Sequence, residues 1–256
     1  MARIFITGSS DGLGRMAAQL LVKQGHKVVL HARGEERGKD AMAAVPGAET
    51  VVTGDLSSIA QTKNVAERVN TLGRFDAVIH NAGVGYQHPR RIATEDGLPQ
   101  EFAVNTLAPY ILTALIQKPK RLVYLSSGLH QNGDDSLEDL AWEKRAWQGQ
   151  QAYSDTKLHD VMLAFAMARR WPGVLSNALE PGWVATKMGG AGAPDDLEEG
   201  YRTQAWLAVS DDAAAKVTGE YFFHMKLRKP HPAARDQEKQ EELIAACEGF
   251  SGVKLP

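Results

Sequence analysis

Short apolar, β-branched runs alternate with longer segments of helical periodicity along the whole chain. Seven runs are predicted to form strands, at residues 4–7, 28–31, 50–53, 77–80, 122–126, 175–179 and 221–223. Helices are predicted between and after them, at about 13–24, 35–44, 58–71, 98–116, 151–170, 197–209 and 235–247. Such alternation indicates right-handed crossovers and a parallel sheet covered on both faces. The pattern predicts an α/β fold with a single doubly wound parallel sheet.

The chain is predicted to be a single domain, residues 1–256, because no linker, repeat or low-complexity segment divides it. Stretches at about 128–150 and 187–205 are predicted to be substrate loops, since long irregular segments in compact folds are usually functional. The glycines within 187–196 are typical of a lid that closes over substrate. Trp142 and Trp147 either line an apolar substrate pocket or form a small separate core.

Composition excludes several classes of function. The 256 residues are 43% hydrophobic with a net charge of −2, so nothing indicates nucleic acid or an anionic membrane as a partner, and a small molecule is expected. The single cysteine, Cys247, excludes an internal disulfide and a zinc site and suits a reducing, cytoplasmic location. Neither a signal peptide nor a membrane span is expected. The segment Val161–Ala168 is apolar almost all round, which fits packing on the sheet and leaves a homo-oligomer open.

A glycine-rich turn follows the first predicted strand directly. Thr7–Gly14 reads T-G-S-S-D-G-L-G, and the next helix is predicted to begin at Leu13. Glycines allow a sharp turn and a close approach to an anion, while a helix start offers free N–H groups and a positive dipole end. The alternative is a turn that only caps the helix. The strand before the turn and the helix after it favour a dinucleotide.

Tyr153 and Lys157 are the second candidate for chemistry. Residues four apart on a helix lie on the same face, about 5–6 Å apart at Cβ. A nearby cation favours the phenolate, so Lys157 is predicted to lower the pKa of Tyr153 towards neutrality. Taken alone, the spacing also fits a chance pair on an exposed helix.

Further motifs occur in a fixed order along the chain. Gly8, Gly12 and Gly14 have the spacing G-x-x-x-G-x-G. The motifs that follow them are Asp55-Leu56, Asn81-Ala82-Gly83, Asn105, Ser126-Ser127, Tyr153 with Lys157, and Pro181-Gly182 with Thr186. The sequence therefore resembles the single-domain short-chain dehydrogenase/reductase family, which implies a Rossmann fold. The stretches Thr94–Leu98 and Gly219–Phe222 resemble its retinol-dehydrogenase-like branch.

The resemblance implies reversible hydride transfer between a nicotinamide and a carbonyl or alcohol. The substrate is expected to be lipophilic or aromatic. Tyr153 would be the general acid and base, and Lys157 would tune it and hold the nicotinamide ribose. Ser127 would hold the substrate oxygen, and Asn105 a water that leads from Lys157 to solvent. Successive strand residues face opposite ways, so only one of Ser126 and Ser127 can point into the cleft. A non-catalytic NAD(P)-sensing regulator on the same fold is the alternative function.

The resemblance also implies which residues bind the cofactor. They are Gly8, Ser10, Asp11, Gly12, Leu13, Gly14, Arg33, Asp55, Leu56, Asn81, Ala82, Gly83, Tyr153, Lys157, Pro181, Gly182, Val184 and Thr186. After the second strand the chain has no acid for a ribose hydroxyl, whereas Arg33 suits the 2′-phosphate of NADP and Ser10 could add a hydroxyl. Asp11 would repel that phosphate. On balance NADP(H) is predicted over NAD(H). His80 is expected to have a structural role. Glu180 is assigned no role from the sequence.

Overall fold

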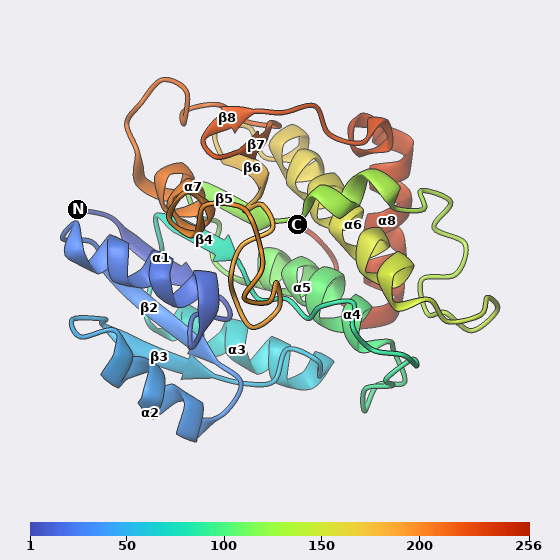
Figure 1. Cartoon of the computed structure of the whole chain (residues 1–256), viewed down its shortest axis with the longest axis horizontal. Helices are drawn as coiled ribbons and strands as arrows, with labels where there is room; N and C mark the ends of the chain where they lie inside the picture. Colours follow the sequence, from blue (N-terminus) through green and yellow to red (C-terminus); the bar gives the residue numbers. More distant parts are fainter.

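An eight-stranded sheet forms the centre of the molecule (Figure 1), and the computed structural model describes all 256 residues. The strand order is β3-β2-β1-β4-β5-β6-β7-β8. The strands are β1 Arg3–Ile6, β2 Lys27–Ala32, β3 Thr50–Thr53, β4 Ala77–His80, β5 Arg121–Leu125, β6 Leu175–Glu180, β7 Tyr221–Phe223 and β8 Lys226–Leu227. All neighbouring strands except β7 and β8 are parallel. The predicted doubly wound α/β fold is confirmed.

Helices cover both faces of the sheet because each buries an apolar stripe against it. One face carries α1 (Gly12–Lys23), α2 (Glu35–Ala44) and α7 (Leu197–Val209). The other carries α3 (Ile59–Thr71), α5 (Ala108–Leu115), α6 (Gly149–Arg170) and α8 (Gln237–Ser251). Successive strand residues serve the two cores alternately: Ile4 packs in the first and Phe5 in the second. None of these helices is both long and apolar enough to cross a bilayer.

Helix α6 is buried over most of its length. Every residue from Ala152 to Met167 is buried, and α8 packs along α6 while the sheet covers its other side (Figure 1). Leu243 and Cys247 of α8 are fully buried in the same core as Val161 and Met162 of α6. The apolar surface of Val161–Ala168 is therefore covered by the C-terminal helix of the same chain, without a second subunit.

The helix predicted over 98–116 is broken into three parts. They are α4 (Gln100–Phe102), a π-helical turn (Ala103–Leu107) and α5. The cause is Pro109 in the first turn of α5, because proline has no N–H for the α-helical hydrogen bond to the carbonyl four residues earlier. The wider turn takes up the mismatch, and Asn105 lies in it.

One edge of the sheet carries a short antiparallel strand, β8, that was not among the predicted strands. β8 pairs antiparallel with β7 through a tight turn at His224 and Met225, whose φ angles are 47° and 61°. Such left-handed turns normally carry glycine or asparagine, so His224 and Met225 do not indicate a hairpin. The predicted loop 128–150 also begins with a 3₁₀ helix, Gly128–Asn132.

Candidate active site

A cleft of about 370 Å³ opens at the carboxyl ends of the central strands. The strand order reverses between β1 and β4, and ligand sites of open α/β sheets lie at such switch points. Of the predicted residues, the cleft is lined by Gly8, Ser10, Asp11, Gly12, Leu13, Arg33, Asp55, Leu56, Asn81, Ala82, Gly83, Tyr153, Lys157, Pro181 and Thr186. The lining does not include Gly14, Asn105, Ser127, Gly182 or Val184, but it does include Ser126. The motifs of both halves of the chain thus converge on one cleft.

The glycine turn is held by hydrogen bonds from the next strand across the switch point. Gly8 has a φ of 61°, and a Cβ there would stand 2.7 Å from Ala82 Cα. Asn81 Nδ2 donates to the carbonyls of Thr7 and Gly8 at 3.0 and 3.1 Å. A Cβ on Gly14 would overlap Asn81 Nδ2 and come within 2.6 Å of Gly8 O. Gly14 therefore permits the close packing of α1 on the turn rather than lining the cleft.

His31 supports the glycine turn from below, a role that sequence reasoning missed. Gly8 N–H donates to His31 Nδ1 at 3.0 Å, and Nε2 lies 3.0 Å from Gly54 O. This arrangement requires a proton on Nε2 and none on Nδ1. Burial lowers the pKa of His31 to about 4, which agrees with a neutral ring.

Basic side chains gather at the far end of the cleft. Arg33 and Arg37 both line it, and neither takes part in any hydrogen bond or ion pair of the structure. Arg37 was missed, although its spacing of four from Arg33 at the start of α2 was a usable signal. Asp11 is paired with Lys187, and this hydrogen bond lowers the pKa of Asp11. The positive charge of Lys187 therefore offsets the negative charge of Asp11, which would otherwise repel a phosphate.

Tyr153 and Lys157 lie side by side on α6, both buried. Lys157 Nζ is 5.7 Å from the centroid of the Tyr153 ring. Burial raises the pKa of Tyr153, while Lys157 and the Ser127 hydroxyl act to lower it. The predicted influence of Lys157 is present, but burial outweighs it, so the net shift is upward and opposite to the prediction. At neutral pH the phenol holds its proton.

Strand phase separates the two serines that follow β5. Ser126 is buried, and its hydroxyl donates to Lys157 O at 2.6 Å, so it is used in holding α6 against the strand. Ser127 Oγ accepts a hydrogen bond from Leu129 N at 3.3 Å and acts on the Tyr153 phenol. The hydroxyl beside Tyr153 is therefore that of Ser127, as the family motif implies.

Asn105 lies behind Gly83, in the π-helical turn. Its Oδ1 accepts from Val84 N at 2.8 Å, and its Nδ2 donates to Val84 O and Thr156 Oγ1 at 3.1 and 3.0 Å. The side chain thus ties the segment after β4 to α6. None of these bonds goes to the backbone of the π-helical turn itself, so Asn105 is a link between two segments beside the site.

The segment that follows β6 lies against the opening of the cleft. Gly182 has a φ of 85°, and a Cβ there would stand 2.7 Å from Asp195 Oδ2, so its role is in the backbone. Val184 is buried and bridges to Asp195. Glu180 pairs with Arg228 at 2.6 Å, and burial raises the pKa of Glu180. Glu180 thus joins β6 to the residue after β8, which gives it a structural contact.

Tyr86 and Met188 lie close to the end of the cleft that contains Tyr153. The rings of Tyr86 and Tyr153 meet edge to face, with centroids 5.5 Å apart. Met188 lines the cleft and lies against Gly85. Tyr86 and Met188 thus border the space next to Tyr153. Trp183, on the same segment as Met188, is 57% exposed.

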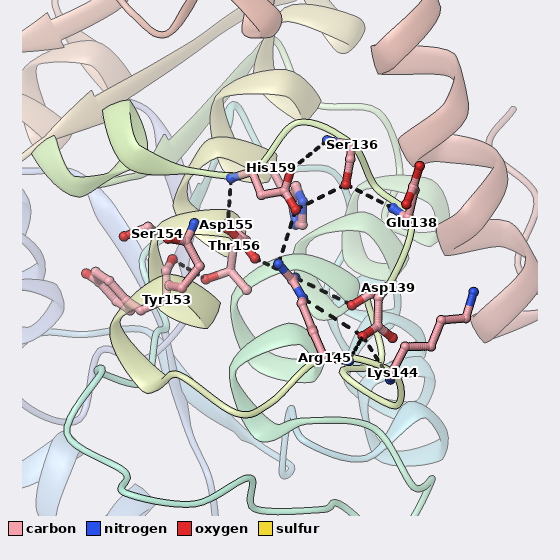
Figure 2. A network of polar contacts seen from close by, with 12 residues as sticks. Ser136, Glu138, Asp139, Lys144, Arg145, Tyr153, Ser154, Asp155, Thr156 and His159 are labelled. Atoms are coloured by element: carbon pink, nitrogen blue, oxygen red, sulfur yellow. Dashed lines mark hydrogen bonds and ion pairs between the residues drawn. The ribbon is translucent and has the colours of Figure 1, made fainter.

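A polar network fixes the loop 133–148 to α6 (Figure 2). Arg145 lies between acidic side chains and contacts Asp134, Asp139 and Asp155 at 3.1, 3.9 and 2.7 Å. Trp142 and Trp147 pack on one another with ring centroids 5.1 Å apart, and neither lines the cleft. Of the two interpretations of these tryptophans, the small separate core is therefore supported.

His80 lies outside the lining of the cleft. His80 Nε2 is 3.0 Å from Thr113 Oγ1, in agreement with a structural role.

Asp160 is the ion-pair partner of Lys157. Asp160 Oδ2 accepts a hydrogen bond from Lys157 Nζ at 2.8 Å. Sequence reasoning missed Asp160, although a carboxylate three residues after Lys157 on one helix was a usable signal.

Comparison with known proteins identifies relatives over the whole length. A sequence model described as short chain dehydrogenase matches residues 2–124. The protein "Uncharacterized oxidoreductase AN7799" of Emericella nidulans is 50% identical over 100% of this chain and 99% of its own. "Short-chain dehydrogenase chyC" of Penicillium rubens is 44% identical over 100% of both chains. Human "Retinol dehydrogenase 13" is 29% identical over 99% of this chain and 85% of its own.

Solved structures share the fold. A crystal structure of an uncharacterized protein from Mycobacterium paratuberculosis superposes with a TM-score of 0.86 at 24% identity, over 100% of this chain and 95% of that one. A blue fluorescent protein from a metagenomic library, solved with NADPH, has a TM-score of 0.70 at 21% identity, over 86% of this chain and 95% of that one.

Proposed function

We propose that this chain, which belongs to the short-chain dehydrogenase family and is an oxidoreductase of carbonyl or alcohol groups, uses NADP(H) with Tyr153 as its general acid and base. The observation that carries the proposal is the layout of the cleft. Tyr153, Lys157 and the Ser127 hydroxyl meet at one end, and the unpaired Arg33 and Arg37 lie at the other. Proton chemistry and phosphate binding are thus separated along one groove.

The residues present fit a dinucleotide phosphate. Gly8 and Gly12 both have left-handed φ angles, and a Cβ on Gly12 would meet no atom within 4 Å, so space is open at that point of the turn. The start of α1 adds free N–H groups. Arg33 and Arg37 are cations without partners, and guanidinium groups bind phosphate in a bidentate way. When bound, the nicotinamide supplies or accepts the hydride.

Each residue at the reactive end then has a defined task. Tyr153, whose pKa is raised by burial, holds a proton at neutral pH and can deliver it to a carbonyl oxygen during reduction. The Ser127 hydroxyl can hydrogen-bond the same oxygen and hold it in line with the phenol. Lys157 can hold the ribose hydroxyls with its ammonium. The protonated phenol is the form that the reduction of a carbonyl requires.

The borders of the space beside Tyr153 support an apolar substrate. Tyr86 and Met188 border that space, and the exposed Trp183 lies on the same segment as Met188. One relative, 30% identical over 88% of this chain, carries the name of a daunorubicin C-13 ketoreductase, and others that of retinol dehydrogenases. We therefore include a lipophilic or aromatic carbonyl compound in the proposal.

The test is a screen of aldehydes and ketones with NADPH, followed by variants on the compound that reacts. Tyr153→Phe removes the proton donor and is expected to lower kcat/KM by about 10²- to 10⁴-fold while NADPH still binds. Tyr86→Phe is the matched control, because it removes a hydroxyl from the neighbouring ring, and it is expected to retain activity within about threefold. Near-normal reduction by Tyr153→Phe would show that the acid is another group.

A further inference from the structure

Asp160 forms a buried ion pair with Lys157 that the reaction as described does not use. It lies one turn after Lys157 on α6, and its Oδ2 is 2.8 Å from Lys157 Nζ. The two side chains are only 3% and 6% exposed. Burying two charges costs solvation, which is repaid only where the geometry is good and further hydrogen bonds are made. Lys157 is the partner that the structure gives to this carboxylate.

The hydrogen bonds of Lys157 leave a single donor free. An ammonium has three N–H donors. One of them goes to Asp160 and another to Leu125 O, also at 2.8 Å. The same Nζ would stand 3.6 Å from a Cβ on Gly83, which lines the cleft. The ammonium is therefore anchored at two points beside the cleft, with one donor left for a ligand.

We propose that Asp160 is a positioning residue, whose carboxylate, together with the Leu125 carbonyl, fixes the Lys157 ammonium beside the cleft and keeps it protonated there. This role rests on the proposed function, in which Lys157 holds the cofactor ribose. Asp160 itself does not line the cleft and acts only through Lys157.

The electrostatics of the pair agree with this geometry. Burial acts to lower the pKa of Lys157, but Asp160 and Tyr153 together more than offset it, so the pKa is raised above its ordinary value. Burial raises the pKa of Asp160 to about 6, although Lys157 acts to lower it. Above pH 6 the carboxylate is therefore charged and can hold the ammonium. Without that charge, burial would make Lys157 lose its proton at a lower pH.

Few other groups near the pair titrate in the same range. Tyr153 on α6 and Tyr124 on β5 both have a pKa raised by burial, so they stay neutral up to strongly alkaline pH. His80 and His159 have pKa values of about 3 because of burial, so they are neutral above pH 5. Between about pH 7 and 10, a change in cofactor binding caused by loss of the Asp160 charge therefore reports on Lys157.

The experiment measures the Kd of NADPH by fluorescence from about pH 7 to pH 10, without substrate. Asp160→Asn keeps an acceptor but removes the charge, so binding is expected within about threefold of wild type at pH 7 and about tenfold weaker, relative to wild type, at the alkaline end. Asp160→Ala removes both the charge and the acceptor, and this variant is expected to bind NADPH more weakly over the whole pH range. Adding Lys157→Met to Asp160→Asn should abolish the extra pH dependence.

Asp155→Asn is the matched control, because it removes the charge of another buried carboxylate on α6, one paired with Arg145. Its Kd is expected to follow the wild-type pH dependence even if its melting temperature falls. Asp160→Asn with a wild-type Kd profile would overturn the proposal and reduce Asp160 to a structural ion pair. If Asp160→Ala does not fold, Asp160→Asn decides alone. Because no substrate is used, failure of the Tyr153 assignment would be seen separately.

Discussion

The two walls of the cleft are held by different kinds of contact. The glycine-turn wall, which comprises residues 7–14, 31–33 and 81–83, is fixed by buried and partly buried hydrogen bonds, such as His31 N to Ser9 Oγ and Gly8 N to His31 Nδ1. The loop wall, which comprises residues 84–88 and 183–196, also has exposed contacts, such as Gln87 Nε2 to Met188 O and Lys187 to Asp11. Buried polar groups must be satisfied in one arrangement, whereas exposed ones can exchange with water.

This difference assigns different tasks to the walls. A rigid surface suits a cofactor whose phosphates and ring must lie in one position. A wall with exposed contacts and several glycines can open and close over a substrate. The comparison predicts that substitutions in the glycine-turn wall change stability and cofactor binding strongly, whereas equivalent substitutions in the loop wall have small effects.

A pair of glycine substitutions tests the comparison most strongly. Gly14→Ala places a Cβ against Asn81 Nδ2 and Gly8 O, so we expect a loss of about 3 kcal/mol in the free energy of unfolding and much weaker NADPH binding. Gly192→Ala, in the loop wall, meets no atom within 4 Å and has no left-handed φ, so we expect a change below about 0.5 kcal/mol. Urea denaturation measures both. Equal losses in the two variants would contradict the difference between the walls.

Acid should weaken the glycine-turn wall through His31. Its pKa is lowered from 6.5 to about 4, so the unfolded chain takes up the proton first, and its contribution to stability is complete above pH 6.5 and is lost as the pH falls towards 4. By pH 5 the loss from this group is about 2 kcal/mol. Urea denaturation at pH 7 and pH 5 measures it. His31→Gln, which does not titrate, should lose about that much less free energy of unfolding between pH 7 and pH 5. An equal loss in this variant and in the wild type would show that His31 is not the group responsible.

Features that depend on local sequence were predictable. The strands, the glycine turn and the Tyr153–Lys157 pair were predictable, because local periodicity and residue spacing determine them. The convergence of Gly8, Arg33 and Tyr153 on one cleft followed from the rule that ligands bind at the carboxyl ends of parallel strands.

Other features depend on contacts between distant segments. The support of Gly8 by His31 requires the register of β1 on β2, and the upward shift of the pKa of Tyr153 requires knowledge of its burial. The hairpin of β7 and β8 was missed because His224 and Met225 carry no turn signal. Tertiary packing, rather than local preference, determines each of these features.

Cofactor choice tests an exposed part of the glycine-turn wall. Arg33 is exposed and unpaired, so we expect Arg33→Ala to raise the KM for NADPH about tenfold, which corresponds to about 1.4 kcal/mol, and to leave the KM for NADH unchanged. Arg33→Lys should recover part of the loss, because a point charge still attracts the phosphate. Steady-state kinetics with both cofactors measure the ratio. An equal rise for NADH would mean that Arg33 does not distinguish the 2′-phosphate.

The contact between the walls, Lys187 to Asp11, should have the smallest effect. The Lys187 side chain is 84% exposed, so Lys187→Ala is expected to change the free energy of unfolding by less than about 0.5 kcal/mol. It leaves Asp11 with only the more distant Arg15, 3.8 Å away, beside the proposed phosphate site, so the KM for NADPH should rise about threefold at low salt and less at high salt. Asp11→Asn keeps an acceptor for the helix cap and removes the repulsion. In the double variant the rise in KM should therefore disappear, whereas its persistence would mean that Lys187 contacts the cofactor directly.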